Sequence, residues 1–466
     1  MKIEKERKDM EVYGYLYEVG LRIIEEQVKE DNYIADYVGY EITDENNLKP
    51  LVVVEVKTKE NMDFKAQQQM FKTAKKFNVP YALLILFNNG NIEKHWFNAK
   101  TSLPIGEPYF EKYENYMEEA KEIQMQIWKI YDLFRNQLDP YEIYEVIITG
   151  ILGKRYLDDI GHPDDWIGIS FNDMWALIRD AKNYFDIDEE RNIYKKLDFR
   201  DVAQYLSALF EPLPPFSKQY INVFADLIYT IEKENNVGIA GVNTQLKNIF
   251  TELISPLYNQ QDSIIDITNG MGFTLLNIAN KTNMNKYVGV EIDPKISFYS
   301  KVLSKIACNK EVLIKNYDSI KLDIKDEYDF VIAQPPLIAK FNKDEYSNYN
   351  LGKKKARSEE LFIEQSLNLL NPGGYTLILT SESVLFSNKN QKLRDYILDT
   401  SIVKGIFSLA PGIYANTNVR LSILVLKKRE SKDNTPQEVF VSEIDDFKKP
   451  YDVLHKFENW IKESEK

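Results

Sequence analysis

Residues 263–337 limit the possible folds of this chain more than any other stretch. They contain short runs of β-branched and aromatic residues at 263–265, 287–290 and 328–333, and each run leads into an acid, a glycine or a proline. Buried parallel strands have this composition because both of their faces are covered, and functional loops follow their carboxyl ends. The stretch therefore predicts the centre of an α/β sheet.

Similar runs recur near residues 311, 374, 403 and 421, with helical patterns between them. This alternation predicts a mostly parallel sheet with helices on both faces, which is a doubly wound, Rossmann-like domain over residues 235–430. Before it, an amphipathic helix over 111–137 and further helical patterns predict a helical connector over 111–234. Residues 431–466 have no comparable pattern, and we expect a polar C-terminal tail there.

Polar residues follow the predicted strands and indicate a ligand site. Gly270 and Gly272 come soon after Asp266, so the chain can turn tightly and a ligand can approach its backbone. Glu291 ends the next strand, at about the 20-residue offset where an acid binds the ribose hydroxyls of a nucleotide. Two further strands lead to Asp318 and to the segment Gln334-Pro335-Pro336-Leu337.

This ordered set resembles the S-adenosylmethionine-dependent N6-adenine DNA methyltransferases, especially the modification subunits of type I restriction systems, over residues 235–430. The resemblance implies that S-adenosylmethionine is the cofactor and DNA the substrate. It assigns cofactor binding to Asp266, Gly270, Gly272, Glu291, Asp318 and Thr244. It assigns the catalytic contacts with a flipped-out adenine to Gln334, Pro335, Pro336 and Leu337.

Three positions depart from the family pattern. Gln334 stands where the family has Asn or Asp, Leu337 replaces an aromatic residue, and Ile267 replaces a proline. The glutamine keeps an amide acceptor but adds a methylene, and the leucine loses the aromatic face that stacks on the base. An active transferase and a lost transferase activity therefore both stay open.

The first 110 residues carry a second constellation, formed by Asp36, Glu55 and Lys57. Strands are predicted at 33–40 and 51–57, so the two carboxylates would lie near the ends of neighbouring strands. Oxygen ligands of this kind bind Mg²⁺, and a lysine on the same strand face as Glu55 can position a water beside the metal. The alternative is a solvated ion pair without function.

This layout resembles the PD-(D/E)xK nucleases, particularly the nuclease domain of type I restriction subunits, over residues 10–100. The resemblance implies a restriction-endonuclease-like α/β domain over 1–110, with Mg²⁺ bound by Asp36 and Glu55. Catalytic roles fall to Asp36, Glu55, Lys57 and Gln69, the last on a predicted helix. We also expect a helix over 11–30 and a strand over 81–87.

The composition limits the partners and the cellular compartment that we expect for the protein. The net charge of −13 argues against broad non-specific binding of nucleic acid, although residues 353–357 form a local basic cluster. The single cysteine fits the cytoplasm, and with only three histidines a zinc site is not expected. The sequence predicts no signal peptide and no membrane span.

Three interpretations follow. The first is a restriction–modification-type DNA-processing protein that fuses an adenine-N6 methyltransferase to a Mg²⁺-dependent nuclease. The second is a DNA nuclease or phage-defence protein whose methyltransferase domain is an inactive cofactor- or DNA-binding scaffold. The third is a non-enzymatic scaffold subunit. Because only a tail is expected after residue 430, sequence specificity would come from a separate specificity or restriction subunit or from the helical region.

Overall fold

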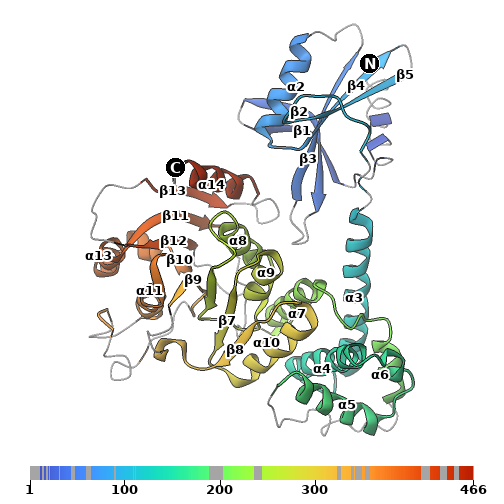
Figure 1. Ribbon diagram of the computed structural model, residues 1–466, viewed down its shortest axis with the longest axis vertical. Helices are drawn as coiled ribbons and strands as arrows, with labels where there is room; N and C mark the ends of the chain where they lie inside the picture. The colour runs from blue at the N-terminus through green and yellow to red at the C-terminus, as the bar shows by residue number, and fades with distance from the viewer. Residues whose placement is uncertain are drawn as a thin grey trace. The chain divides into compact units, whose positions relative to one another are not determined.

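The computed structural model describes all residues except 1–10, 13–14, 17–18, 20, 22, 31, 43–47, 59–63, 89–90, 109, 111, 188–202, 236–243, 323–326, 337–340, 342–348, 352–356, 411–419, 431–437, 445–450 and 465–466. The chain divides into two compact units, residues 1–119 and 120–466 (Figure 1). The finer division at 110, 234 and 430 stays a prediction. Within the described residues, no helix combines the length and the hydropathy needed to cross a membrane.

The first unit is a five-stranded sheet in the order β1-β2-β3-β4-β5. Only β3 and β4 are parallel, and helix α2 connects them, as parallel neighbours require. Alternate strand residues are buried on opposite faces, with Val52 and Val54 on one face and Val53 against α2 on the other. The bounds are β1 Ile23–Glu30, β2 Tyr33–Ile42, β3 Leu48–Thr58, α2 Phe64–Lys76, β4 Tyr81–Asn88 and β5 Asn91–Asn98.

The helix predicted over 11–30 is wrong in its second half. Residues Ile23–Glu30 form β1, which pairs antiparallel with β2, and helical turns occur only before it in the described part of this stretch. Apolar residues spaced at three and four fit either structure in so short a segment. Pairing with β2 supplies the backbone hydrogen bonds that a helix would otherwise make, so the tertiary contact decides.

The second unit begins with helices that share a core with the sheet behind them. The predicted amphipathic helix is confirmed as α3, whose Ile123, Ile127 and Phe134 are buried in that core. Asp139 ends the break after α3 and caps α4 by accepting from the Tyr141 and Glu142 amides. The bounds are α3 Lys112–Phe134, α4 Pro140–Asp159, η2 Pro163–Trp166, α5 Phe171–Tyr184, α6 Ala203–Phe210, α7 Gln219–Asn235 and α8 Thr244–Ile254.

An eight-stranded sheet follows, in the order β13-β11-β12-β10-β9-β6-β7-β8. Its pairings are parallel except those of β12 with β10 and β11, so the predicted mostly parallel sheet is confirmed. The bounds are β6 Ser263–Asp266, α9 Phe273–Lys281, β7 Lys286–Glu291, α10 Pro294–Ala307, β8 Leu313–Asn316, η4 Ser319–Lys321, β9 Tyr328–Ala333, α11 Ser358–Asn368, β10 Leu370–Ser381, α12 Ser383–Phe386, η6 Asn388–Asn390, α13 Gln391–Thr400, β11 Ser401–Leu409, β12 Leu421–Lys428, β13 Phe440–Ile444 and α14 Tyr451–Ser464.

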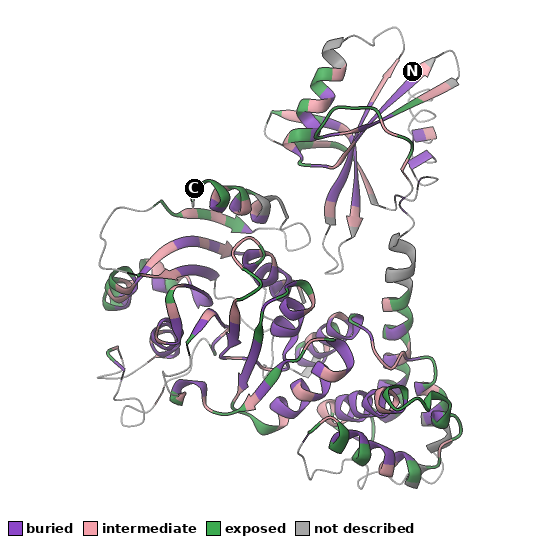
Figure 2. Cartoon of the chain, viewed as in Figure 1, coloured by how far each residue is buried: buried purple, intermediate pink, exposed green. Residues whose placement is uncertain are grey.

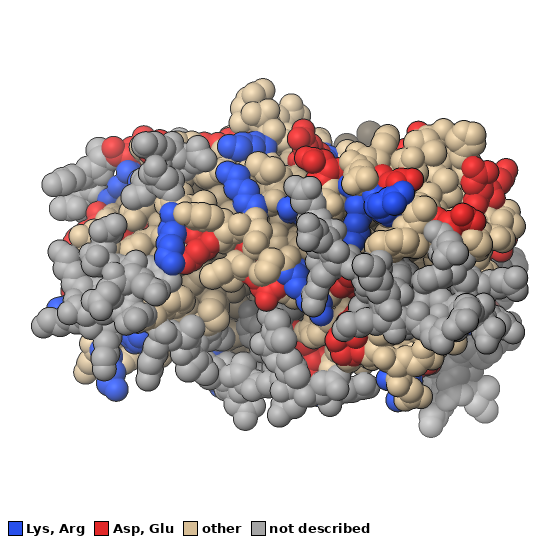
Figure 3. Space-filling model, turned by 90° about the horizontal axis from the view of Figure 1, so that it is seen from below, with Lys and Arg blue, Asp and Glu red and all other residues tan. Residues whose placement is uncertain are grey.

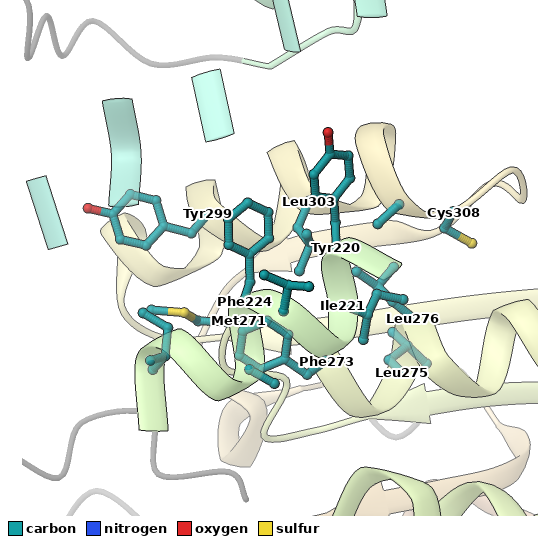
Figure 4. Close-up of a cluster of buried hydrophobic side chains, with 14 of the residues drawn as sticks. Tyr220, Ile221, Phe224, Met271, Phe273, Leu275, Leu276, Tyr299, Leu303 and Cys308 are labelled. Atoms are coloured by element: carbon teal, nitrogen blue, oxygen red, sulfur yellow. The ribbon is translucent and has the colours of Figure 1, made fainter. Parts of the chain in front are cut away.

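Helices cover both faces of this sheet, and its central strands are buried (Figure 2). Ile264 and Phe330 point into the core with α9 and α10, whereas their neighbours Ile265 and Val331 point into the core with α11 and α13. On the first face, side chains of α7, α9 and α10 point toward one another (Figure 4). These two cores fix the strands whose carboxyl ends carry the candidate site.

Residues 431–466 hold more structure than the expected tail. Strand β13 pairs in parallel with β11 and extends the sheet, and α14 packs against β13 and α8. Helix α14 buries Leu454, Phe457 and Ile461, which recur at three and four as an amphipathic helix requires. The spacing of these apolar residues could have predicted helix α14 from the sequence. Strand β13 is too short and too polar to show the alternation of apolar and polar residues that indicates a strand.

Asp329 joins the amino ends of three central strands, and its loss should destabilise the second unit. Its carboxylate accepts from the Ser263 amide and hydroxyl at 2.9 and 2.8 Å, and from Asn371 Nδ2 at 2.8 Å. We expect Asp329→Ala to lower the free energy of unfolding by about 1.5–3 kcal/mol near neutral pH, as hydrogen bonds to a charge suggest. Urea denaturation measures this, with the exposed Asp399→Ala as a control that should change nothing.

The same carboxylate predicts a pH dependence. Burial opposes its ionisation, but the hydrogen bonds from Asn371 and Ser263 outweigh that effect and hold the pKa of Asp329 below its usual value. A depressed pKa stabilises the fold above the unfolded pKa of about 3.9, and this contribution is lost as the pH falls through the folded pKa. The stability difference between wild type and Asp329→Ala should therefore shrink in acid, and a constant difference would contradict this account.

Candidate functional site

The sheet brings the predicted cofactor and base residues to one edge. Strands β9, β6, β7 and β8 are adjacent and parallel, so their carboxyl ends lie side by side. Asp266 ends β6, Glu291 ends β7, and Gln334 directly follows β9. This edge is where ligands bind in open α/β sheets.

The loop after β6 uses its glycines as predicted from sequence. Gly270 and Gly272 have φ values of +54° and +87°, in the left-handed region that only glycine adopts without strain. An added Cβ at Gly272 would lie 2.4 Å from Ser300 Oγ. Ser300 accepts from Asn269 Nδ2 at 2.8 Å, so the loop is held against α10 as well as entering α9.

Glu291 ties this loop to the end of β7. Its Oε2 accepts from the Gly270 amide at 2.9 Å, and its Oε1 accepts from the Asp293 amide at 2.8 Å. Each carboxylate oxygen has a second lone pair, so both can still accept from a ligand. Burial raises the pKa of Glu291 from its usual value, against the effect of these hydrogen bonds.

Two exposed large hydrophobic residues adjoin Glu291 along the backbone. Ile292 is 67% exposed and Tyr317 is 49% exposed. The Tyr317 amide donates to the Glu291 carbonyl at 3.0 Å, and Asn316 Nδ2 donates to the Glu291 and Ile292 carbonyls at 2.8 and 3.0 Å. A carboxylate with exposed apolar residues close by in the backbone fits a nucleoside, whose sugar carries hydroxyls and whose base is flat.

Asp266 is buried behind the loop and linked to the base segment. Its Oδ1 accepts from the Thr268 amide and hydroxyl at 2.9 and 3.2 Å. The same hydroxyl accepts from the Gln334 amide N–H at 2.6 Å. Thr268 therefore joins the loop after β6 to the segment after β9, a role that the sequence did not suggest.

Burial raises the pKa of Asp266 to about 7, and the charge of Glu291 adds to the effect. A raised carboxylate pKa means that the folded state binds more protons than the unfolded state between about pH 4 and pH 7. The contribution of Asp266 to stability therefore falls as pH rises through this range. Wild type should lose about 2–3 kcal/mol more stability than Asp266→Asn between about pH 5 and pH 8, and urea denaturation at both pH values checks it. Parallel losses would show that Asp266 titrates normally.

Gln334 turns its amide toward α9. Its Nε2 donates to Thr274 Oγ1 at 2.9 Å, while its Oε1 is buried and has no hydrogen-bond partner among the described residues. An unpartnered buried acceptor is costly unless a donor reaches it. Of the adjoining residues, Pro335 is buried, Pro336 is exposed, and Leu337 lies outside the described residues. Thr274 was also not identified from the sequence. The only indication of its role in the sequence is that it places a hydroxyl in the helix that follows the two glycines.

The structure links the remaining candidate cofactor residues less closely to the glycine loop. Asp318 follows β8, where its Oδ1 caps η4 through the Ile320 amide at 3.1 Å and its Oδ2 lies 3.2 Å from Lys321 Nζ. Thr244 begins α8, but its side chain is outside the described part. Of the basic cluster at 353–357, the structure describes Arg357, which donates to Glu360 at 2.8 Å.

The first unit brings three of its four candidates together. Lys57 Nζ lies 2.5 Å from Glu55 Oε1 and 4.0 Å from Asp36 Oδ2. Asp36 Oδ2 also accepts from the Val56 amide at 2.8 Å, which fixes the carboxylate beside β3. Burial raises the pKa of Glu55 despite its contact with Lys57. Gln69 is exposed on α2, and within the described residues no three metal-binding side chains are grouped to hold an ion.

Comparison with known protein families finds a match within the second unit. Residues 244–464 match the family model described as N-6 DNA Methylase. The matched region contains the glycine loop, Glu291, Gln334 and also β13 and α14.

A curated relative belongs to a restriction system. The chain is 22% identical over 261 residues to the type I restriction enzyme MpnII methylase subunit of Mycoplasma pneumoniae, covering 47% of each protein. The chain spans less than two thirds of the length of the curated relatives it matches, with 47% of one and 63% of another.

Solved structures share the fold. A putative class I S-adenosylmethionine-dependent methyltransferase from Listeria monocytogenes superposes with a TM-score of 0.55 at 19% identity, over 74% of this chain and 99% of that one. The type IIG restriction endonuclease BpuSI superposes with a TM-score of 0.50 at 14% identity, over 96% of this chain and 59% of that one. At these identities the likeness concerns the fold alone.

Proposed function

We propose that the domain over 244–464 is a DNA methyltransferase that transfers a methyl group from S-adenosylmethionine to N6 of adenine. The observation that carries the proposal is the junction at Thr268, whose hydroxyl bonds both Asp266 and the Gln334 amide. These two hydrogen bonds hold the cofactor loop and the base segment together at the edge of the sheet. Methyl transfer needs this arrangement because two reactants must be aligned within a fraction of an ångström.

The residues at the edge fit the cofactor. Glu291 retains acceptor capacity for the ribose hydroxyls, and Ile292 with Tyr317 offers apolar surface to the adenine ring. At Gly270 an added Cβ would meet only the Thr268 carbonyl at 3.9 Å, so a ligand can approach the backbone there, and Asp266 holds Thr268 from behind the loop. The cofactor, when bound, supplies a methyl group made electrophilic by a positive sulfur.

Gln334 would hold the acceptor base. Its Oε1, which no described group satisfies, accepts a hydrogen bond from the adenine N6 amino group, and the carbonyl of Pro335 is the second acceptor in reach of the same segment. These bonds orient the nitrogen lone pair toward the methyl group. The N6–carbon bond forms as the carbon–sulfur bond breaks with its electrons to sulfur, and one N6 proton then leaves to solvent.

The test is transfer of a labelled methyl group to unmethylated genomic DNA, followed by separation of the nucleosides. The proposal expects the label in N6-methyladenine. Label in N4-methylcytosine would overturn the choice of base, and cofactor binding without transfer would favour an inactive, cofactor-binding scaffold. A separate specificity or restriction subunit is part of the proposal, since the curated relative is named as a subunit. The assay is therefore repeated with proteins that co-purify with the chain.

We propose a second function, Mg²⁺-dependent cleavage of DNA, for the first unit. It is supported by the contact of Lys57 with both Glu55 and Asp36 and by the fold shared with a restriction endonuclease over 96% of this chain. Asp36 and Glu55 offer oxygen ligands suited to Mg²⁺, and Lys57 can hold the attacking water.

Lys57→Ala should abolish metal-dependent cutting of DNA while leaving methyl transfer unchanged. The reason is that the two carboxylates lose the group that neutralises them and orients water. Lys49→Ala is the matched control, because Lys49 lies on the same strand and pairs with Glu41 at 3.1 Å, away from this cluster. Nicking and linearisation of a plasmid with Mg²⁺ provide the measurement. Equal cutting by Lys57→Ala and wild type would remove the nuclease assignment.

A further inference from the structure

Phe386 is the most exposed large hydrophobic side chain in the part of the chain that the structure describes. It ends α12 and is 76% exposed, although it belongs to the same domain as a well-packed core. Val384, two residues earlier, is fully buried and anchors the short helix, whereas Ser383 and Phe386 are exposed. An exposed aromatic ring on an anchored segment is a candidate contact with a partner.

Hydrogen bonds brace the segment that carries this ring. The Arg394 guanidinium donates to the Val384 and Ser387 carbonyls at 2.9 and 2.8 Å, on either side of Phe386. Asn390 Nδ2 donates to the Ser383 carbonyl at 2.7 Å, and the Glu382 amide donates to the Arg420 carbonyl at 3.0 Å. The backbone that carries the ring is thus held in place before any ligand arrives, which lowers the entropy cost of binding.

The segment lies at the same sheet edge as Gln334. Strand β10 is parallel to β9, with Ile378 level with Ala333. Counting along both strands places Ser381, the last residue of β10, level with the exposed Pro336. Phe386 follows on α12, so the segment that carries it leaves the sheet at the edge where Gln334 also follows its strand.

Exposed cations lie on the segments that adjoin α12. Lys389 of η6 and Lys392 of α13 belong to elements that contact α12, and the Arg420 carbonyl accepts from the Glu382 amide just before α12; we call these three residues and Phe386 the Phe386 patch. The chain as a whole has a net charge of −13, and the face drawn in Figure 3 shows basic and acidic side chains interspersed. A local group of cations around an aromatic ring is the combination that binds a nucleic-acid strand by stacking and phosphate contacts.

We infer that Phe386 stacks on a base of the DNA substrate. The inference rests on the proposed function for its substrate but concerns a contact outside the residues assigned above. It also supplies an aromatic face at an edge where Leu337 offers none. The stacked base is either the extrahelical adenine or a base beside it, and both have the same π-face chemistry.

The experiment measures DNA binding directly, by fluorescence anisotropy with labelled oligonucleotides and S-adenosylhomocysteine present. Phe386→Ala should weaken binding by about 5- to 150-fold, the range for loss of one base–aromatic stack. Phe386→Trp should keep wild-type affinity. Leu398→Ala is the matched control, because Leu398 is 57% exposed on α13 of the same domain, and it should bind as wild type.

Two further comparisons complete the test. An affinity loss confined to adenine-containing strands identifies the extrahelical adenine, whereas an equal loss on strands without adenine identifies a neighbouring base. Unchanged binding by Phe386→Ala, or an equal loss in Leu398→Ala, overturns the inference. If the wild type transfers no methyl group but Phe386→Ala still weakens DNA binding, the proposed function is overturned and the stacking contact is supported.

Discussion

Replacing Glu291 by alanine should abolish stabilisation of the protein by S-adenosylmethionine. A ligand present at 100 times its dissociation constant adds about 2.7 kcal/mol to the folded state. The variant loses the carboxylate that would accept from the ribose, and it also loses the hydrogen bonds to the Gly270 and Asp293 amides that shape the loop. The first loss removes a contact with the bound cofactor and the second releases the loop that shapes its site, so the thermal shift with cofactor should disappear.

The control for this experiment is Glu311→Ala. Glu311 is an exposed glutamate of the same domain outside the site, and its removal makes the same change in charge. The control should show the full cofactor shift. If Glu291→Ala shifts as much as wild type, the carboxylate does not hold the ribose and the cofactor site lies elsewhere.

Gln334→Leu should reduce the rate of methyl transfer by about 10²-fold or more and leave cofactor binding unchanged. Leucine has nearly the volume of glutamine but cannot accept from the adenine amino group or donate to Thr274. Single-turnover rates measure the loss, and the cofactor thermal shift shows whether the loop is intact. The effect should appear in the rate because the lost bond orients the reacting nitrogen.

A variant with asparagine at position 334 can be compared with Gln334→Leu and with wild type. Gln334→Asn keeps the amide, and combined with Leu337→Tyr it restores the residues that the family carries. We expect this double variant to methylate faster than wild type, since the base segment gains the aromatic ring and the shorter acceptor that the family carries. Wild-type rates in Gln334→Leu would show that this amide has no part in the reaction.

The sequence predicted the second sheet well, for a physical reason. Strands such as β6 and β9 are buried on both faces, so they appear as short runs of apolar and aromatic residues ending at Asp266 and Gln334. The order of those strand ends also located the candidate site. Parallel strands that alternate with helices must place their carboxyl ends on one edge.

The misses arose where local pattern and tertiary structure disagree. Strand β1 was read as helix because its pairing with β2, which the local spacing does not encode, decides its conformation. Strand β13 depends on the edge of β11 in the same way. The roles of Thr268 and Thr274 depend on hydrogen bonds to Gln334, some 60 residues away along the chain, and spacing carries no information about such contacts.

The central claim is that the second unit transfers a methyl group from S-adenosylmethionine to adenine. The most direct test incubates equimolar protein and cofactor with unmethylated genomic DNA and quantifies both products by mass spectrometry. We expect N6-methyladenine and S-adenosylhomocysteine in equal amounts, and formation of both to be about 10²-fold slower with Gln334→Leu. Formation of neither product by a wild-type protein that binds the cofactor and the DNA would contradict it.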